Sequence, residues 1–411
     1  MSTSNQIVDH FFRRQSAKIV AILSKIYGLV HIETIEDCVQ DTMITALEQW
    51  ALQSIPDKPE AWLIDVARKK LINQLNRAST YQTKVLASIS NDNPHLEEQP
   101  VLTDHFIKDT QLRMLLACCH PGIQQEGQIA LALKTLCGFG VQEIANALFT
   151  SKDTVNKQLY RAKQMFRNGQ VALVMPGKEQ LEGRLNVVLK TIYLVFNEGY
   201  FSAIDQQIVS KDICFESIRM GQELESAFPD YTPIKAFLAL ALFQFARFDA
   251  RYDEHGVLLL FEEQNRLLWN KPMIDQAMSY LNDSQGDTLS EYHIQAGILA
   301  EYVLAERCDR TCWENILKYY DLHLSIYNSD YMRLNYAIAL FKAGNEDKAE
   351  AVLQALEKHS RLKKHWQLYF ALSTFYFLKG DPQKGKDYAD RCTKMNAPPV
   401  ALTKLDAQWH R

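Results

Sequence analysis

The chain has 411 residues, a formal net charge of −4 at pH 7 and 23% charged residues. This length exceeds what one ordinary hydrophobic core needs, so we expect two to four domains. Glycine and proline are sparse and long β-branched alternations are missing, so we expect an all-α fold. No apolar run reaches the roughly 18 residues of a membrane span, and the eight scattered cysteines form no secreted disulfide framework. We therefore expect a cytoplasmic protein with no membrane partner.

Residues 35–50, with the sequence IEDCVQDTMITALEQW, predict a helix with an acidic face and an apolar stripe. The acidic and polar face consists of Glu36, Asp37, Gln40 and Asp41. The apolar stripe, which we expect to be buried, repeats every four residues at Ile35, Val39, Met43 and Leu47. Two interpretations are open: the acidic face is simply solvated, or it docks a basic partner helix.

Residues 61–77, AWLIDVARKKLINQLNR, predict a second helix with a cationic flank. Its buried stripe is expected at Leu63, Ala67, Leu71 and Leu75. The flank carries Arg68, Lys69, Lys70, Asn73, Asn76 and Arg77. We expect residues 1–77 to form one compact helical domain, and residues 78–105 to form a flexible linker because Ser, Asn, Asp, Glu and Pro dominate there.

Residues 140–167 predict two helices joined by a turn, of which the second is basic. Ser151 is a plausible N-cap, and Asp153 suits the first turn because the helix dipole favours an acid there. The buried stripe is expected at Val155, Leu159, Ala162 and Phe166, and the other faces carry Lys152, Asn156, Lys157, Arg161, Lys163 and Arg167. Such a helix can dock in the major groove of duplex DNA. The alternative is an ordinary amphipathic helix with a solvated cationic face.

The C-terminal half reads as packed helices with a repeat signal. A helix, a Gly followed by Asn or Asp, and a second helix occur at residues 335–353 and again at residues 372–389. Gly344 and Gly380 are thus 36 residues apart, close to the roughly 34-residue tetratricopeptide period. In this alignment Leu340 matches Tyr376. The alternative is a generic helical bundle.

Other candidate sites in the sequence are weaker. Cys118, Cys119 and His120 are adjacent, but no CxxC or spaced His pair supplies further zinc ligands, so buried core cysteines are the favoured interpretation. Residues 262–266, EEQNR, are polar, yet no nucleophile or metal cage accompanies them. Phosphate-binding, dinucleotide-binding and hydrolase motifs are missing. We therefore expect no enzyme activity, no cofactor and no bound metal.

The order of four elements gives the chain a resemblance to a known family. An acidic EDxxQD helix, an AWLxxxAR helix, a polar linker and a helix-turn-helix ending in RAK resemble an extracytoplasmic-function (ECF) RNA polymerase sigma factor of the bacterial sigma-70 superfamily. The segments at 116–140, 192–200 and 261–269 resemble the subgroup with a C-terminal tetratricopeptide-like extension. The resemblance covers essentially the whole chain.

This resemblance implies a domain order and a set of contacts. Residues 1–77 would be sigma region 2, residues 106–170 sigma region 4, and residues 171–411 a helical regulatory domain that could take a protein or peptide partner. The clamp helices of core RNA polymerase would be contacted by Glu36, Asp37, Gln40 and Asp41. The melted downstream promoter element would be contacted by Arg68, Lys69, Asn73 and Arg77. The duplex upstream element would be read by Lys152, Asn156, Lys157 and Arg161, with Lys163 as a further DNA-binding candidate.

A second function stays open at this point. A one-component transcription regulator could bind duplex DNA through the helix-turn-helix and sense a signal through the tetratricopeptide-like repeats. Such a regulator has no need of the acidic face that begins at Glu36, and this face therefore discriminates between the two functions.

Overall fold

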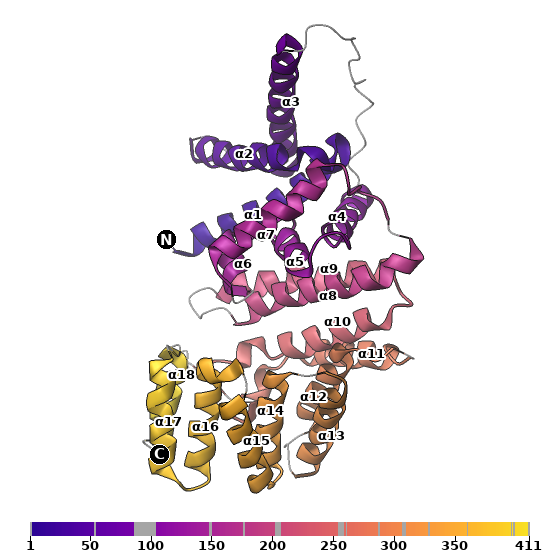
Figure 1. Cartoon of the computed structure of the whole chain (residues 1–411). Helices are drawn as coiled ribbons and strands as arrows, with labels where there is room; N and C mark the ends of the chain where they lie inside the picture. Colours follow the sequence, from indigo (N-terminus) through magenta and orange to yellow (C-terminus); the bar gives the residue numbers. More distant parts are fainter. Residues whose placement is uncertain are drawn as a thin grey trace. The chain divides into compact units, whose positions relative to one another are not determined.

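A computed structural model describes residues 2–52, 55–85, 104–147, 150–175, 177–201, 207–253, 259, 261–286, 288–305, 310–327, 329–359, 361–395, 397 and 399–409. These residues form α-helices and short 3-10 helices, which confirms the predicted all-α fold (Figure 1). The chain divides into two compact units, Met1–Glu223 and Leu224–Arg411. Each unit is built around its own packed helices.

The first unit begins with helices that cover α1 on several sides. Its first elements are α1 (Ser2–Tyr27), η1 (Leu29–His31), α2 (Ile32–Leu52) and α3 (Pro59–Val85). Trp50 of α2 stacks on Phe12 of α1 with ring centroids 5.6 Å apart, and it lies 5.5 Å from the ring of Trp62 at the start of α3. Lys18 of α1 pairs with Glu60 at 2.6 Å. Aromatic packing and this ion pair thus join α1, α2 and α3.

The apolar stripe predicted on α2 is buried in part. Ile35, Val39 and Met43 are buried, as predicted, but Leu47 is 49% exposed. Four residues turn an α-helix by 400°, so each step of four drifts by about 40° around the axis. By the third step Leu47 has moved about 120° from Ile35, which carries it off the buried side.

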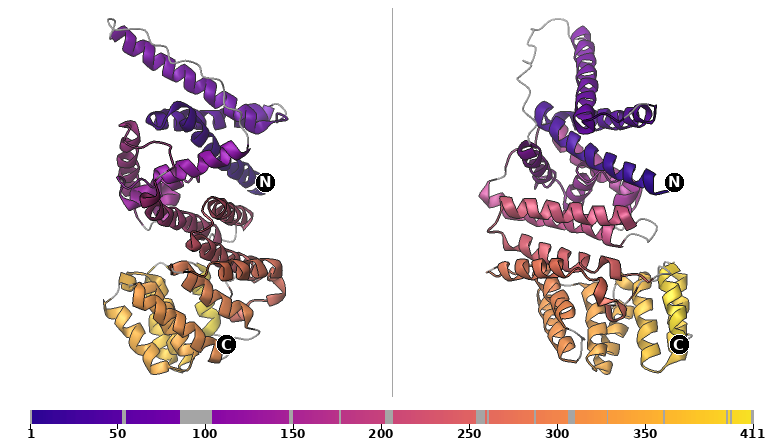
Figure 2. Two further views of the ribbon diagram at one scale, coloured as in Figure 1. Left: turned by 90° about the vertical axis from the view of Figure 1, so that its right-hand side faces the viewer. Right: turned by 180° about the vertical axis from the view of Figure 1, so that it is seen from behind.

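The α3 helix is longer than its sequence pattern predicted. It continues to Val85, so the expected linker at 78–105 begins inside a helix, and residues 86–103 lie outside the described part. Figures 1 and 2 show α3 projecting from the other helices of its unit. The sequence of residues 78–85 is largely polar, so its composition resembles that of a linker.

The second part of the first unit contains the predicted basic helix. Its elements are α4 (Asp104–Cys118), α5 (Gln125–Thr135), α6 (Val141–Ala147), α7 (Lys152–Arg167), α8 (Lys178–Phe201) and α9 (Gln207–Ala227). The α8 helix packs on α4 and α5. Its buried Arg184 donates a hydrogen bond to the carbonyl oxygen of Leu116 at 3.3 Å. The predicted domain border at 170/171 therefore falls inside the first compact unit.

The second unit is a row of helices (Figure 1) and contains clusters of buried apolar side chains. Its elements are α10 (Thr232–Phe245), η3 (Phe248–Ala250), η4 (Phe261–Glu263), η5 (Arg266–Leu268), α11 (Lys271–Asp283), α12 (Glu291–Leu304), α13 (Arg310–Ile326), α14 (Asp330–Lys342), α15 (Glu346–His359), η6 (Arg361–Lys364), α16 (Trp366–Leu378), α17 (Pro382–Lys394) and α18 (Pro399–Trp409).

Two helix pairs in this unit turn in the same way, at the positions where the sequence repeats. Gly344 lies between α14 and α15 with φ 83°, and Gly380 lies between α16 and α17 with φ 86°, a backbone conformation that favours glycine. The amide that follows each glycine donates to the carbonyl of Leu340 at 2.8 Å in the first pair and of Tyr376 at 2.9 Å in the second. The aligned positions thus have the same role in both turns.

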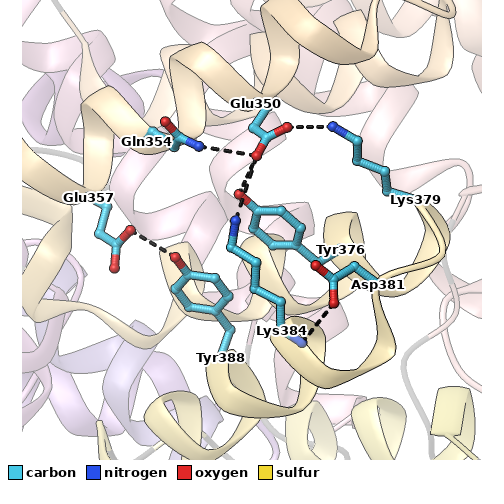
Figure 3. Close-up of polar contacts among 8 residues, drawn as sticks. All are labelled: Glu350, Gln354, Glu357, Tyr376, Lys379, Asp381, Lys384 and Tyr388. Atoms are coloured by element: carbon cyan, nitrogen blue, oxygen red, sulfur yellow. Dashed lines mark hydrogen bonds and ion pairs between the residues drawn. The ribbon is translucent and has the colours of Figure 1, made fainter.

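Polar side chains fasten the second helix pair to the first (Figure 3). Glu350 of α15 accepts a hydrogen bond from the Tyr376 hydroxyl at 2.7 Å and pairs with Lys379. The hydrogen bond from Lys379 is the largest cause that lowers the pKa of the Glu350 carboxyl. The Lys384 ammonium lies 3.8 Å from the centroid of the Tyr376 ring, and the Tyr388 ring stacks on Tyr376 at 5.6 Å.

A close helix contact in the second unit gives a stability prediction. A Cβ atom added at Gly297 of α12 would lie 2.5 Å from Cε1 of Tyr319 in α13. Gly297→Ala should therefore destabilise this unit by about 1–3 kcal/mol, the usual cost of overpacking. Urea unfolding of the full chain measures the effect. The control is Gly183→Ala in α8, where an added Cβ meets nothing within 4 Å; equal stability of the two variants would contradict the prediction.

Candidate functional site

The predicted acidic side of α2 faces solvent. The opposite side of α2 packs on α1 and α3. Asp37, Gln40 and Asp41 are exposed, and the neighbouring Ile44 and Leu47 are 48% and 49% exposed. Residues on an α-helix are 100° apart, so Asp37, Asp41 and Ile44 lie within about 60° of one another around the axis. We call Asp37, Gln40, Asp41, Ile44 and Leu47 the α2 face. It offers a partner both negative charge and apolar contact area.

Glu36, the fourth predicted acidic-face residue, is held by another part of the first unit. Its carboxylate pairs with the Lys163 ammonium of α7, and its Oε1 accepts a hydrogen bond from Oγ1 of Thr135 in α5 at 3.2 Å. One turn earlier on α2, Oε2 of Glu33 pairs with Nη1 of Arg167 at 2.9 Å. The structure therefore joins a residue predicted to bind polymerase to a residue predicted to bind DNA.

The cationic flank of α3 lies in the middle of the helix, at residues 68–77. Arg68 and Lys69 both lie near Asp65, with N–O distances of 3.8 and 2.6 Å. Asn73 and Arg77 lie further along the same helix and are exposed. All four predicted residues therefore lie on one helix, and Lys69, Asn73 and Arg77 are exposed to solvent.

The structure confirms the local sequence pattern of α7. Val155, Leu159, Ala162 and Phe166 are buried, as predicted. The Ser151 hydroxyl accepts a hydrogen bond from the Thr154 amide at 3.2 Å, which makes it the N-cap. The α6 and α7 helices contact each other directly.

The predicted DNA-binding residues of α7 fall into two groups. Lys152, Asn156, Lys157 and Arg161 are exposed on its first three turns. The Lys163 side chain is only 14% exposed, because its ammonium is paired with Glu36. Four of the five residues are thus open to a partner in this conformation, and Lys163 is occupied.

The adjacent Cys118, Cys119 and His120 do not form a metal site in the described part of the chain. Both thiols are buried, and burial raises the pKa of Cys119 to about 12. A metal ligand is the thiolate, which such a pKa disfavours at neutral pH. Among the residues that the structure describes, no three His, Cys, Asp or Glu side chains are placed to share a metal ion.

The polar segment 262–266 connects helices of the second unit. Glu262 pairs with Lys342 at 3.2 Å and Glu263 pairs with Lys404 at 2.7 Å. The Arg266 guanidinium donates to backbone carbonyl oxygens at the C-terminal end of α12, including that of Tyr302 at 3.1 Å. Cations favour a helix C-terminus, so this segment has a structural role in the second unit.

The comparisons relate the N-terminal helices to a known family and the chain to one relative. A family model of sigma-70 region 2 matches residues 5–80, so the N-terminal helices form a sigma-70 region 2 domain, which supports a role in transcription initiation. This match supports a sigma-70 family RNA polymerase sigma factor. An uncharacterized protein of Rhizobium meliloti (strain 1021) is 32% identical over 331 residues, which cover 79% of this chain and 78% of that protein.

Two further comparisons concern the rest of the chain and its structure. Residues 184–285 match a family of unknown function, DUF6596. No solved structure matches the chain. Of the helices in the described ranges, none is long and apolar enough to cross a membrane.

Sequence reasoning missed three residues that bear on the site. Glu33 and Thr135 carry no signal of their role, because a single acid or threonine in a helix is ordinary. Arg167 was recognised only as one cation among several on α7. All three act through contacts between segments about 99 to 134 residues apart in sequence, which no local pattern encodes.

Proposed function

We propose that the chain is an ECF sigma factor that directs core RNA polymerase to a set of promoters in the bacterial cytoplasm. Catalysis would belong to the polymerase, and the chain would contribute binding and positioning. The α2 face is the observation that carries this proposal. It lies in the segment matched by sigma-70 region 2, and it is exposed, acidic and partly apolar.

The alternative, a one-component regulator with a helix-turn-helix and a repeat sensor, does not account for this surface. Such a protein needs a duplex-reading helix and a sensor. It has no use for an exposed acidic helix with apolar neighbours, which suits a basic protein partner.

Two elements of the first unit would bind promoter DNA. The exposed Asn73 and Arg77 of α3 would face the melted downstream element, together with Arg68 and Lys69. The α6–α7 pair would act as a helix-turn-helix whose Lys152, Asn156, Lys157 and Arg161 read the duplex upstream element. Cations would fix phosphates, and a few side chains would read base edges.

The second unit would regulate the first as a tetratricopeptide-like domain. Its two glycine-turned helix pairs are stacked side by side, as in repeat proteins that bind a protein or peptide. Because it is covalently attached, even weak contacts with the sigma part or its partners would act at a high effective concentration.

Initiation in vitro tests the function. The purified chain is mixed with core RNA polymerase and fragmented genomic DNA of its source organism, and the 5′ ends of the transcripts are sequenced. We expect a reproducible set of start sites that core polymerase alone does not use. Binding of the chain to the upstream DNA without polymerase, and no new start sites with it, would instead favour the one-component regulator.

A further inference from the structure

Glu36 and Lys163 connect the two surfaces on which the proposed function rests. The Glu36 carboxylate receives the Lys163 ammonium on one oxygen and the Thr135 hydroxyl on the other. The two paired side chains are only 18% and 14% exposed, and Thr135 is buried. Hydrogen bonds between ionised groups are stronger than neutral ones, and they are electrostatically stronger away from water because the local dielectric is lower. The Glu36–Lys163 contact is therefore stronger than an ion pair that is fully exposed on the surface.

A second ion pair extends the contact at its solvent edge. Glu33 and Arg167 pair at 2.9 Å, with 42% and 33% of their side chains exposed. Each of these residues lies within one helical turn of Glu36 or Lys163 on its own helix. The N-terminal end of α2 is thus attached to the C-terminal end of α7 by two ion pairs of the same polarity.

Apolar packing supports the same closed arrangement. Residues 19–23 of α1 are all buried. Five consecutive helical residues point in every direction around the axis, so a single neighbouring helix cannot cover them. Indeed α1 contacts α2 and α3 as well as α4 and α5. The helices of region 2 and those that precede α7 therefore share one core.

We infer that this contact is an autoinhibitory latch, a conclusion that rests on the proposed function. While the latch is closed, Glu36 is unavailable to polymerase and Lys163 is unavailable to DNA. Polymerase and promoter would then both bind the open chain better than the closed one. A ligand that binds only a fraction of the population has an apparent affinity reduced by that fraction.

Lys163→Gln tests the latch in the full-length chain. The exchange of backbone hydrogen for deuterium over residues 32–41 is measured in the free protein, and the dissociation constant for core polymerase is measured without DNA. We expect faster exchange and about tenfold tighter polymerase binding, because the open fraction rises. The control is Lys190→Gln, which removes one exposed cation from α8 of the same unit and should leave both quantities at their wild-type values.

Arg167→Gln keeps the test valid if the loss of Lys163 disturbs folding. Both partners of this outer ion pair are at least a third exposed, so we expect the same direction of change with a smaller size. Wild-type exchange in both the Lys163 and Arg167 variants would overturn the latch. Faster exchange with unchanged polymerase affinity would overturn its inhibitory role. Failure of the wild-type chain and every variant to bind polymerase would instead overturn the proposed function.

Discussion

Replacing Asp37 and Asp41 with lysine should abolish binding of the chain to core RNA polymerase while leaving its fold intact. Both carboxylates are exposed, and the side of α2 that holds the fold is the opposite one, with Ile35 and Val39 fully buried. The substitution turns attraction to a basic partner into repulsion, and like charges facing each other across an interface cost several kcal/mol. We therefore expect no co-purification of the variant with core enzyme.

The control for this experiment carries the same change in net charge at another place. Asp387 and Asp390 are exposed on α17 of the second unit, and their double replacement by lysine should leave polymerase binding at the wild-type level. Circular dichroism and the unfolding midpoint verify the fold of both variants. Recovery of the Asp37 and Asp41 variant with core enzyme at wild-type yield would contradict the α2 face as the binding surface.

The second large effect concerns the basic helix. Lys157→Ala and Arg161→Ala should each weaken binding to the upstream promoter element, by about 1–3 kcal/mol where the side chain contacts a base edge. A side chain that contacts phosphate should instead weaken binding to all sequences alike and reduce the slope of affinity against salt by roughly one. Both residues are exposed and stand opposite the buried stripe of α7.

Titration of promoter DNA and of an unrelated duplex at several salt concentrations separates these two cases. Lys190→Ala, which removes an exposed lysine from α8, is the matched control and should behave as wild type. Wild-type affinity and salt dependence in both the Lys157 and Arg161 variants would rule out α7 as the recognition helix.

Local patterns predicted the local structure well. The buried residues and N-cap of α7 follow from a 3.6-residue period and a serine before it, and the turns at Gly344 and Gly380 follow from the conformational freedom of glycine. These features depend on neighbours within a few residues. The period of exactly four that we expected on α2 failed at Leu47 because an α-helix does not have that period.

Local sequence patterns could not predict the contacts that shape the candidate site. The Glu36–Lys163 pair spans 127 residues in sequence, so it depends on how two helical segments pack. The extension of α3 to Val85 was missed because residues 78–85 have the polar composition that is also typical of a linker. The predicted roles of the α2 and α7 residues in binding partners stay predictions for the experiments described above.

The buried Arg184 has a practical consequence for anyone who recombines such chains. Its guanidinium reaches from α8 to the backbone of α4, and Ser217 of α9 in turn donates to the Ile192 carbonyl of α8 at 2.8 Å. A chimera joined between residues 170 and 171, where the sequence predicts a domain border, would pair α4 and α5 with a foreign α8. Grafts made after Ala227, where α9 ends just beyond the border of the first compact unit, would keep both contacts native.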